Sequence, residues 1–205
     1  MTLLAWVSDG DPRLRAGGSL ADALAEVALV PVENSAVLAY RDRMVRWAAE
    51  HADSLHRTCL AAHFTSSALV ADATAQHVLL MHHRKLRRWL QPGGHADGQG
   101  NLAGSALREA TEETGIAGLR VAAPAIDLDI HEVDPPKEGR HLHLDVRYLV
   151  VAPPGAQPVG NHESIALRWV ALAELGDFGL DDGLHRLVSA GIAAFERLEP
   201  NIPHA

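Results

Sequence analysis

Cysteine, aromatic side chains and long apolar runs are all scarce in this chain of 205 residues. The single Cys59 has no partner for an internal disulfide, which is typical of proteins from a reducing compartment. Unbroken apolar runs fall short of the ~18–20 residues that a membrane span needs. The first residues lack the charged start of a signal peptide. These absences predict a cytoplasmic protein that has no membrane partner.

Positive charge is also in short supply. The chain has 18 Lys and Arg against 26 Asp and Glu, which gives a formal net charge of −8. Proteins that bind nucleic acid usually carry a basic patch, so this balance argues against a nucleic-acid partner. A small nucleotide substrate is still compatible with it, because a metal ion can bridge phosphates to acidic side chains. With 47% hydrophobic residues, the chain can bury one good core.

Two regions differ in their patterns. Residues 1–62 predict a helical extension packed on the rest of the chain, with apolar residues at helical spacing between Val37 and Ala48 and Asn34 or Ser35 as N-cap. Residues 63–205 are predicted to form the main domain, with helices over 101–114 and 183–198. Its strands are predicted at 66–71, 77–82, 126–131, 141–151 and 166–170. The order of elements predicts an α+β fold, a mixed central sheet in an α/β/α sandwich.

The segment from Gly94 to Ile116 contains three glutamates at i, i+3 and i+4, namely Glu109, Glu112 and Glu113. On a helix these positions share one narrow face. Three like charges so close together repel one another, and a hard divalent cation such as Mg²⁺ turns that repulsion into binding. The spacing therefore predicts a metal site, against the plainer interpretation of a solvated acidic helix face.

The same segment resembles the box of the Nudix family, which is Gly, five residues, Glu, seven residues, then Arg-Glu-apolar-x-Glu-Glu-x-Gly-apolar. Gly94 begins the match, Arg108-Glu109-Ala110 follows at the right distance, and 112–116 completes it. The preceding stretch 89–94 and the later stretch 167–175 are also similar to family segments, so the resemblance covers about residues 63–176. One position departs from the pattern, because Gly100 stands where the box has its first glutamate, with Asp97 nearby.

The resemblance implies a mixed sheet between helices, with the box as a loop–helix–loop. It also implies hydrolysis of a pyrophosphate bond in a nucleoside diphosphate linked to another group. Mg²⁺ or Mn²⁺ is the implied cofactor, bound by Glu112 and Glu113, with Glu109 as a further ligand or as the group that orients water. The carbonyl of Gly93 matches a main-chain ligand of the family. Arg108 is expected to pair with a box carboxylate, and a homodimer is compatible with the family.

Several residues outside the acidic triad are candidates for the same site. Glu163 precedes the strand predicted at 166–170, in the region where the family often has its general base. Lys85 and Arg87 precede the glycines and are predicted to contact phosphate, with a purely structural role as the alternative. Trp89 is predicted to stack on a base or to pack under the loop. His95, within the box loop, is a further candidate for binding substrate.

The two strands after the box show polar residues alternating with apolar ones. An antiparallel hairpin with a loop over 132–140 predicts three opposed pairs, His131 with His141, Asp129 with His143, and Asp127 with Asp145. Opposed carboxylates are unfavourable unless a proton, an imidazolium or a cation intervenes. This face, including Asp129, His141, His143 and Asp145, is predicted to line the substrate cleft as a second metal site or a pH-sensitive surface. The alternative is an ordinary polar outer face of the sheet.

Other functions have weaker support. A Nudix domain weakened by Gly100 would bind a nucleotide ligand as a sensor. The run from His141 to Asp145 resembles part of a metallo-hydrolase signature, but its sixth position is Val146. Isomerisation of a prenyl diphosphate is disfavoured because Cys59 precedes the predicted sheet. Substrate identity depends on 1–62 and 132–162, which carry no pattern that specifies it.

Overall fold

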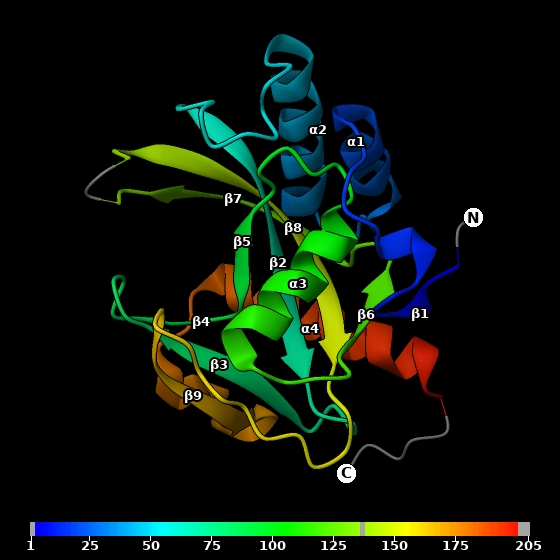
Figure 1. Cartoon of the computed structure of the whole chain (residues 1–205), viewed down its shortest axis with the longest axis vertical. Coiled ribbons are helices and arrows are strands. Elements are labelled where there is room, and N and C mark those ends of the chain that lie inside the picture. The colour runs from blue at the N-terminus through cyan, green and yellow to red at the C-terminus, as the bar shows by residue number, and fades with distance from the viewer. Residues whose placement is uncertain (1–2, 136–137, 201–205) are drawn as a thin grey trace.

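The computed structural model describes residues 3–135 and 138–200. Two long parallel strands, β2 (Ala62–Ala71) and β8 (His141–Val151), form the centre of its mixed sheet (Figure 1). They pair residue by residue from Ala62 opposite Leu142 to Ala71 opposite Val151. Both strands are rich in apolar residues because helices cover both faces of the sheet.

The sheet divides on either side of this central pair. On the β8 side, β7 (Asp127–Val133) pairs with the first part of β8 and β6 (Arg120–Ala123) with its end. On the β2 side, β5 (Gly93–His95) pairs with residues 65–67, and β3 (His77–His83) pairs near the end of β2. The remaining strands join the outer edges, β4 (Trp89–Leu90) and β9 (Ser164–Ala171) on β3, and β1 (Ala5–Ser8) on β6.

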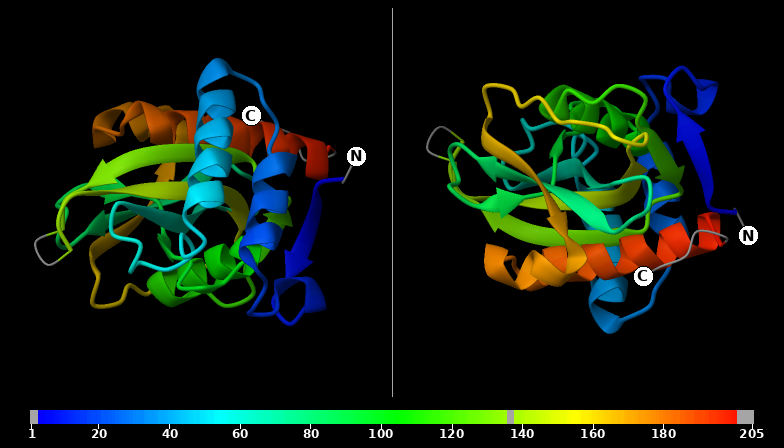
Figure 2. Two further views of the ribbon diagram at one scale, coloured as in Figure 1. Left: turned by 90° about the horizontal axis from the view of Figure 1, so that it is seen from above. Right: turned by 90° about the horizontal axis from the view of Figure 1, so that it is seen from below.

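Helices form a layer on each face of the sheet (Figure 2). On one face, α3 (Leu102–Thr114) packs on a hydrophobic cluster that also includes α1 (Leu20–Leu29) and α2 (Ser35–Glu50). On the other face, α4 (Asp182–Leu198) packs on a second cluster. Short 3-10 helices span Pro12–Leu14 (η1) and Leu172–Phe178 (η2). Within the described residues, none of the helices combines the length and the apolar character needed to cross a membrane.

Strand alternation explains why the sheet needs both layers. In β8, Val146, Tyr148 and Val150 belong to the α3-side cluster, whereas Leu149 and Val151 belong to the α4-side cluster. Near the start of the strand the α4-side positions are polar instead, and β2 changes in the same way. One end of the central pair is therefore apolar on both faces, while the other end has a polar face.

The predicted fold class is confirmed, and the predicted helices agree within one residue of their bounds. The box helix begins after Asn101 and ends at Gly115, which has the left-handed conformation (φ +66°) that glycine favours at a helix end. The side chain of Asn34 caps α2 by accepting a hydrogen bond from the backbone N–H of Val37 (3.0 Å). These are local features, so the sequence alone is enough to predict them.

The predicted helices before residue 62 are present as α1 and α2, and the same stretch also contains β1, which pairs with β6 and adds a strand to the sheet. One structural prediction was wrong. The β7–β8 register is shifted by two residues, because β7 continues to Val133, which lies opposite His141. As a result His131 lies opposite His143, and Asp129 opposite Asp145. A shift of two residues leaves every side chain on its predicted face.

Candidate active site

The box helix α3 places its three glutamates in three different environments. Its apolar side packs on β2, and Glu113, next to that packed side, is only 3% exposed. Glu109, one turn earlier, is half-buried, and Glu112 is exposed. The carboxylates therefore lie along the margin between the core and the surface, where a bound ion can be reached from solvent and held by the protein.

Glu113 has the most strongly altered environment of the three. Burial, together with the nearby carboxyls of Glu109 and Glu163, raises the pKa of Glu113 to about 8. The backbone N–H of Gly93 donates to its Oε2 (2.9 Å) and opposes this change. Burial likewise raises the pKa of Glu109. Carboxylates that repel one another at a partly buried position are stabilised when they bind a proton or a cation.

The adjacent glycines allow β5 to approach these carboxylates. A Cβ at Gly93 would lie 2.6 Å from the Ser67 Oγ, and one at Gly94 would lie 2.5 Å from the carboxyl carbon of Glu109. Any larger residue at position 94 would therefore displace the Glu109 side chain. The sequence pattern Gly93-Gly94 has a packing reason at both positions.

Glu163, in the loop before β9, lies near the same glutamates. The loop before β9 lies against the end of α3, where the Val159 N–H donates to the Thr114 carbonyl (2.7 Å) and Asn161 donates to the Glu112 carbonyl (3.3 Å). The Glu163 carboxyl lies close enough to Glu113 to raise the pKa of that residue. The structure therefore brings the candidate base and the helix glutamates together.

Arg84 holds this loop in position, and sequence reasoning did not single it out. Its guanidinium donates to the carbonyls of His162 and Ser164 (2.9 Å each), and its backbone N–H donates to the Glu163 carbonyl (2.8 Å). An arginine in a short turn gives no sign of such a role, because the carbonyls that it binds lie about 80 residues further along the chain.

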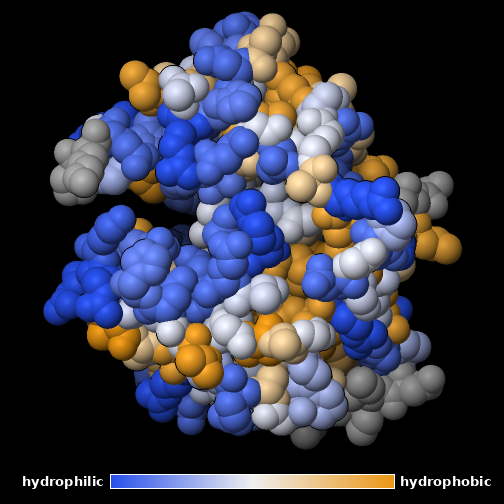
Figure 3. Space-filling view, in the orientation of Figure 1, coloured by the Kyte–Doolittle hydropathy of each residue, from blue (hydrophilic) through white to orange (hydrophobic). Residues whose placement is uncertain are grey.

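The cationic and aromatic candidates differ in what they contact. Arg108 pairs with Glu109 (2.5 Å), as the resemblance implied. Lys85 and Arg87 are exposed in the turn between β3 and β4. Trp89 stacks on His82 and meets Phe178 edge-on. In Figure 3 the face that carries α3 is hollowed on its left side, and hydrophilic residues border the hollow.

The position that departs from the box is occupied by the N-terminal segment. A Cβ at Gly100 would overlap the carbonyl oxygen of Ser19. The carbonyl of Gly17 accepts hydrogen bonds from the backbone N–H groups of Gly100 (2.9 Å) and Asn101 (3.0 Å). The side chain of a glutamate at position 100 would collide with this segment, so the loss of the first box glutamate and the docking of residues 17–19 go together.

The polar face of β7 and β8 is neutralised from within the protein. Arg147, which is buried, lies 2.9 Å from Asp145, 2.8 Å from Asp129 and 3.4 Å from Asp127. Arg186 of α4 lies 3.0 Å from Asp127 and 2.8 Å from Asp129. Two guanidinium groups therefore supply the positive charge that the opposed carboxylates require.

The network includes both aspartates that were candidates for substrate binding, Asp129 and Asp145. Despite its burial, Asp129 has a pKa well below the usual value because His131, Arg147 and Arg186 interact with it. The oxygens of Asp145 also accept hydrogen bonds from the hydroxyls of Thr65 and Ser67 (2.8–2.9 Å). Arg147 continues the alternation after His143 and Asp145, so its face was predictable from the sequence, whereas the contribution of Arg186 was not.

Comparison with known proteins identifies the family. The model described as the NUDIX domain matches residues 62–190, which is more than half of the chain. The chain therefore belongs to the Nudix family. A search of curated proteins finds no match.

Solved structures of the family share the fold. The chain is similar to the binary complex of a Caenorhabditis elegans Ap4A hydrolase, with a TM-score of 0.51 and 17% identity over 64% of this chain and 96% of that one. It is also similar to a Nudix-family hydrolase from Clostridium perfringens (TM-score 0.49, 22% identity, 64% and 97% covered). A third similar structure is the NUDIX domain of Shewanella oneidensis NrtR complexed with ADP ribose (0.48, 20%, 72% and 97%). At 17% identity, the likeness to the Ap4A hydrolase shows the fold alone.

Proposed function

We propose that this protein hydrolyses a pyrophosphate bond in a nucleoside diphosphate linked to another group, or in a similar small phosphorylated metabolite, with the help of Mg²⁺ or Mn²⁺. The observation that carries the proposal is the convergence of Glu109, Glu113 and Glu163 in a partly buried place. Burial and mutual repulsion raise the pKa of Glu113 to about 8 in this arrangement. Such a cluster of carboxylates is unfavourable unless it binds a cation. Membership of the Nudix family suggests that this cation assists hydrolysis.

The donor set fits a hard divalent ion. Glu109, Glu112 and Glu113 offer carboxylate oxygens, and the Gly93 carbonyl is in the adjacent strand, next to the N–H that contacts Glu113. Mg²⁺ and Mn²⁺ prefer such oxygen ligands. When bound, such an ion would neutralise phosphate charge and make water a better nucleophile.

The residues of the chain then have distinct tasks. Glu163 accepts a proton from the attacking water, because its carboxyl faces the box glutamates and its side chain is 42% exposed to solvent. Arg108 holds Glu109 in place through their ion pair. Lys85 and Arg87, exposed in the β3–β4 turn, contact the phosphates of the substrate. These positions align a water with a diphosphate, which is most of what phosphoryl transfer needs.

A substrate panel tests the proposal. Nucleoside diphosphate compounds, with Ap4A and ADP-ribose among them, are incubated with Mg²⁺, with Mn²⁺ or with a chelator, and the products are separated. We expect cleavage of at least one compound that stops with the chelator. In ¹⁸O-labelled water the label must enter one phosphate product, because water is the nucleophile. Glu163→Gln should slow turnover, whereas Glu196→Gln, the same change on exposed α4, should not.

The same panel distinguishes the sensor alternative, which Gly100 suggests. Tight binding of one compound by calorimetry, with no turnover under any metal condition, would replace hydrolysis by ligand sensing. Cleavage that continues unchanged in the chelator would contradict the role given to the glutamates.

A further inference from the structure

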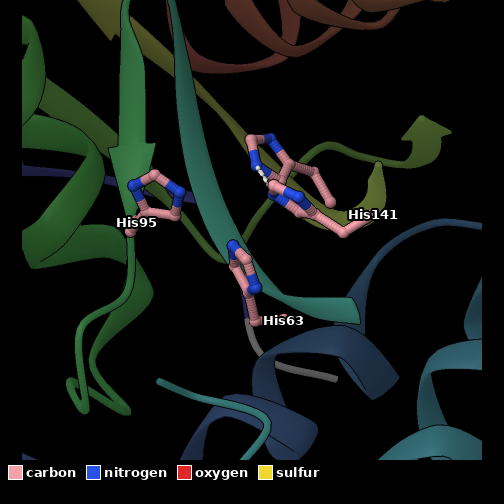
Figure 4. Close-up of side chains that lie close together, drawn as sticks. His63, His95 and His141 are labelled. Atoms are coloured by element: carbon pink, nitrogen blue, oxygen red, sulfur yellow. Dashed lines mark hydrogen bonds between the residues drawn. The ribbon is translucent and has the colours of Figure 1, made fainter. Parts of the chain in front are cut away.

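Four histidines meet inside the protein, on the polar face near the start of β2 and β8. They are His63 of β2, His95 of β5, and His141 and His143 of β8 (Figure 4). Each offers a ring nitrogen, and the four nitrogens all lie within 4.8 Å of one another. His63 and His141 are 1% and 4% exposed, and the other two are half-buried.

Strand pairing alone brings these rings together. The parallel register of β2 and β8 sets His63 opposite His143, and alternation along β8 puts His141 on the same face two residues earlier. In the antiparallel β2–β5 pair His95 lies opposite Thr65, two residues after His63. Because residues two apart on a strand share a face, all four side chains emerge on one side of the sheet.

Two of the rings are held through Nδ1, with Nε2 turned toward the cluster. The Nδ1 of His63 lies 3.1 Å from the carbonyl of Cys59, and the Nδ1 of His141 lies 2.8 Å from the carbonyl of Gly139. A carbonyl only accepts, so Nδ1 carries a proton in both rings, and in the neutral form of such a ring Nε2 is the nitrogen with the lone pair. Metal-binding histidines commonly use this arrangement, since the carbonyl orients the ring and strengthens the other nitrogen as a ligand.

The buried nitrogens lack other partners. The Nε2 atoms of His63 and His95 are buried and make no hydrogen bond within the described structure. Buried polar atoms are normally paired, so two unpaired nitrogens that face the same cluster require an explanation. The Nε2 atoms of His141 and His143 lie 3.3 Å apart. Two nitrogens bound to one tetrahedral ion at about 2.0–2.1 Å are separated by about 3.4 Å.

We propose that His63, His95, His141 and His143 bind a first-row transition-metal ion such as Zn²⁺, at a site distinct from the carboxylates of the box. Imidazole nitrogens suit Zn²⁺, Co²⁺, Ni²⁺ and Cu²⁺, whereas Mg²⁺ prefers oxygen. Arg57, whose charge reaches the cluster, is paired with Asp97 (2.5 Å).

The position of the site suggests its effect. Four protein ligands fill a tetrahedral ion, which is the pattern of a structural site rather than a catalytic one. An ion there would fasten β5 to β2 and β8, and β5 carries Gly93 and Gly94 next to the box glutamates. The ion would therefore stabilise the strand that leads into the active-site loop without taking part in hydrolysis.

Cobalt spectroscopy on the metal-free chain tests this site. Mg²⁺ is kept in excess so that the carboxylates are occupied, and Co²⁺ is then added while visible absorption is recorded. We expect one equivalent to give the intense bands of tetrahedral Co²⁺, and Zn²⁺ to abolish them by displacement. Free Zn²⁺ at about a hundred times its Kd should raise the Tm by about 5–10 °C.

Variants identify the ligands. His63→Ala and His95→Ala should each weaken binding by more than about a hundredfold, which exceeds the 10–100-fold effect typical of an outer partner. His95 is half-buried, so its variant is informative even if His63→Ala fails to fold, and far-UV circular dichroism checks both. His185→Ala, on the exposed side of α4, should bind normally, and so should E109Q/E112Q/E113Q.

The outcomes separate this proposal from the hydrolytic one. Absence of the bands in the unaltered chain, or normal Co²⁺ binding by His95→Ala, would overturn the histidine site. Bands that disappear in E109Q/E112Q/E113Q but persist in the histidine variants would place the ion on the carboxylates and overturn it too. Bands that follow the histidines support the site, whether or not the protein hydrolyses any compound of the panel.

Discussion

At the scale of single residues, the environment of each box glutamate differs more than the helical spacing suggests. Glu112 is exposed, Glu109 is paired with Arg108, and Glu113 is buried with one backbone N–H as its donor. Of the three glutamates, Glu113 is the one whose negative charge is least stable in the metal-free protein. A bound cation would therefore stabilise this carboxylate most. This residue should therefore separate the effect on activity from the effect on stability.

Glu113→Gln should lower kcat at least about a hundredfold, a barrier change of about 2.7 kcal/mol, because a charged ligand is lost. The Tm should stay the same or rise, since the amide removes a charge that burial disfavours. Steady-state kinetics on a cleaved compound and thermal unfolding measure the two effects. Glu196→Gln is the control, and a Glu113→Gln protein with near-normal turnover would count against the assignment.

At the scale of elements, the N-terminal segment and the box are packed as one unit. Residues 17–19 lie against Gly100, and β1 extends the sheet through β6. The contact with the Ser19 carbonyl is with backbone, which cannot rotate away as a side chain can. The absence of a side chain at position 100 is therefore a condition for this docking.

Gly100→Ala should lower the free energy of unfolding by about 1–3 kcal/mol, the usual cost of overpacking, or should release the segment around Ser19. Urea denaturation measures the first result and limited proteolysis the second. Gly176→Ala is the matched control, because a Cβ there has no neighbour within 4 Å among the described residues. Equal stability of the two variants, with no new cleavage, would show that the docking is loose.

The β7–β8 pair and α4 are joined by charge. Arg147 contacts Asp127, Asp129 and Asp145, and it also donates to the carbonyl of Gly183 in α4 (3.0 Å). Removal of this guanidinium would leave buried carboxylates short of positive charge. The resulting loss of folding stability is far larger than the loss caused by removing a surface ion pair.

Arg147→Leu should reduce the free energy of unfolding by about 3–5 kcal/mol. Chemical denaturation measures it, with Arg197→Leu as control, since the Arg197–Glu33 pair is exposed and 3.8 Å long. We expect the control to be unchanged within error. If Arg147→Leu lowered the free energy of unfolding as little as Arg197→Leu does, solvent would have to reach the aspartates.

At the scale of the whole molecule, buried neutral histidines link stability to pH. Burial, followed by the neighbouring histidines, lowers the pKa of His143 to about 2, whereas an unfolded chain has an ordinary histidine near 6.5. Between these values the unfolded state binds a proton that the folded state does not. Stability therefore falls as the pH falls below about 6.5.

In a chelator, the free energy of unfolding should decrease by about 1.4 kcal/mol per pH unit for His143 alone between about pH 6 and pH 5. Urea denaturation at several pH values measures this slope, and His143→Gln should make it shallower by that amount. Parallel slopes for the two proteins would show that His143 is protonated in the folded state.

The sequence by itself determined the features that depend on near neighbours. The helical spacing of Glu109, Glu112 and Glu113, the cap at Asn101 and the left-handed Gly115 follow from contacts within a few residues. The alternation of β7 and β8 likewise predicted which side chains share a face. The Nudix fold follows from such local patterns together with the box.

Only the tertiary structure decided what those faces meet. The carboxylates of β7 and β8 meet the guanidinium groups of Arg147 and Arg186. His143 meets His63 and His95, which lie far away in the sequence. These partners depend on strand register and on which helix covers which face, and both result from the packing of the whole core. No local spacing contains that information.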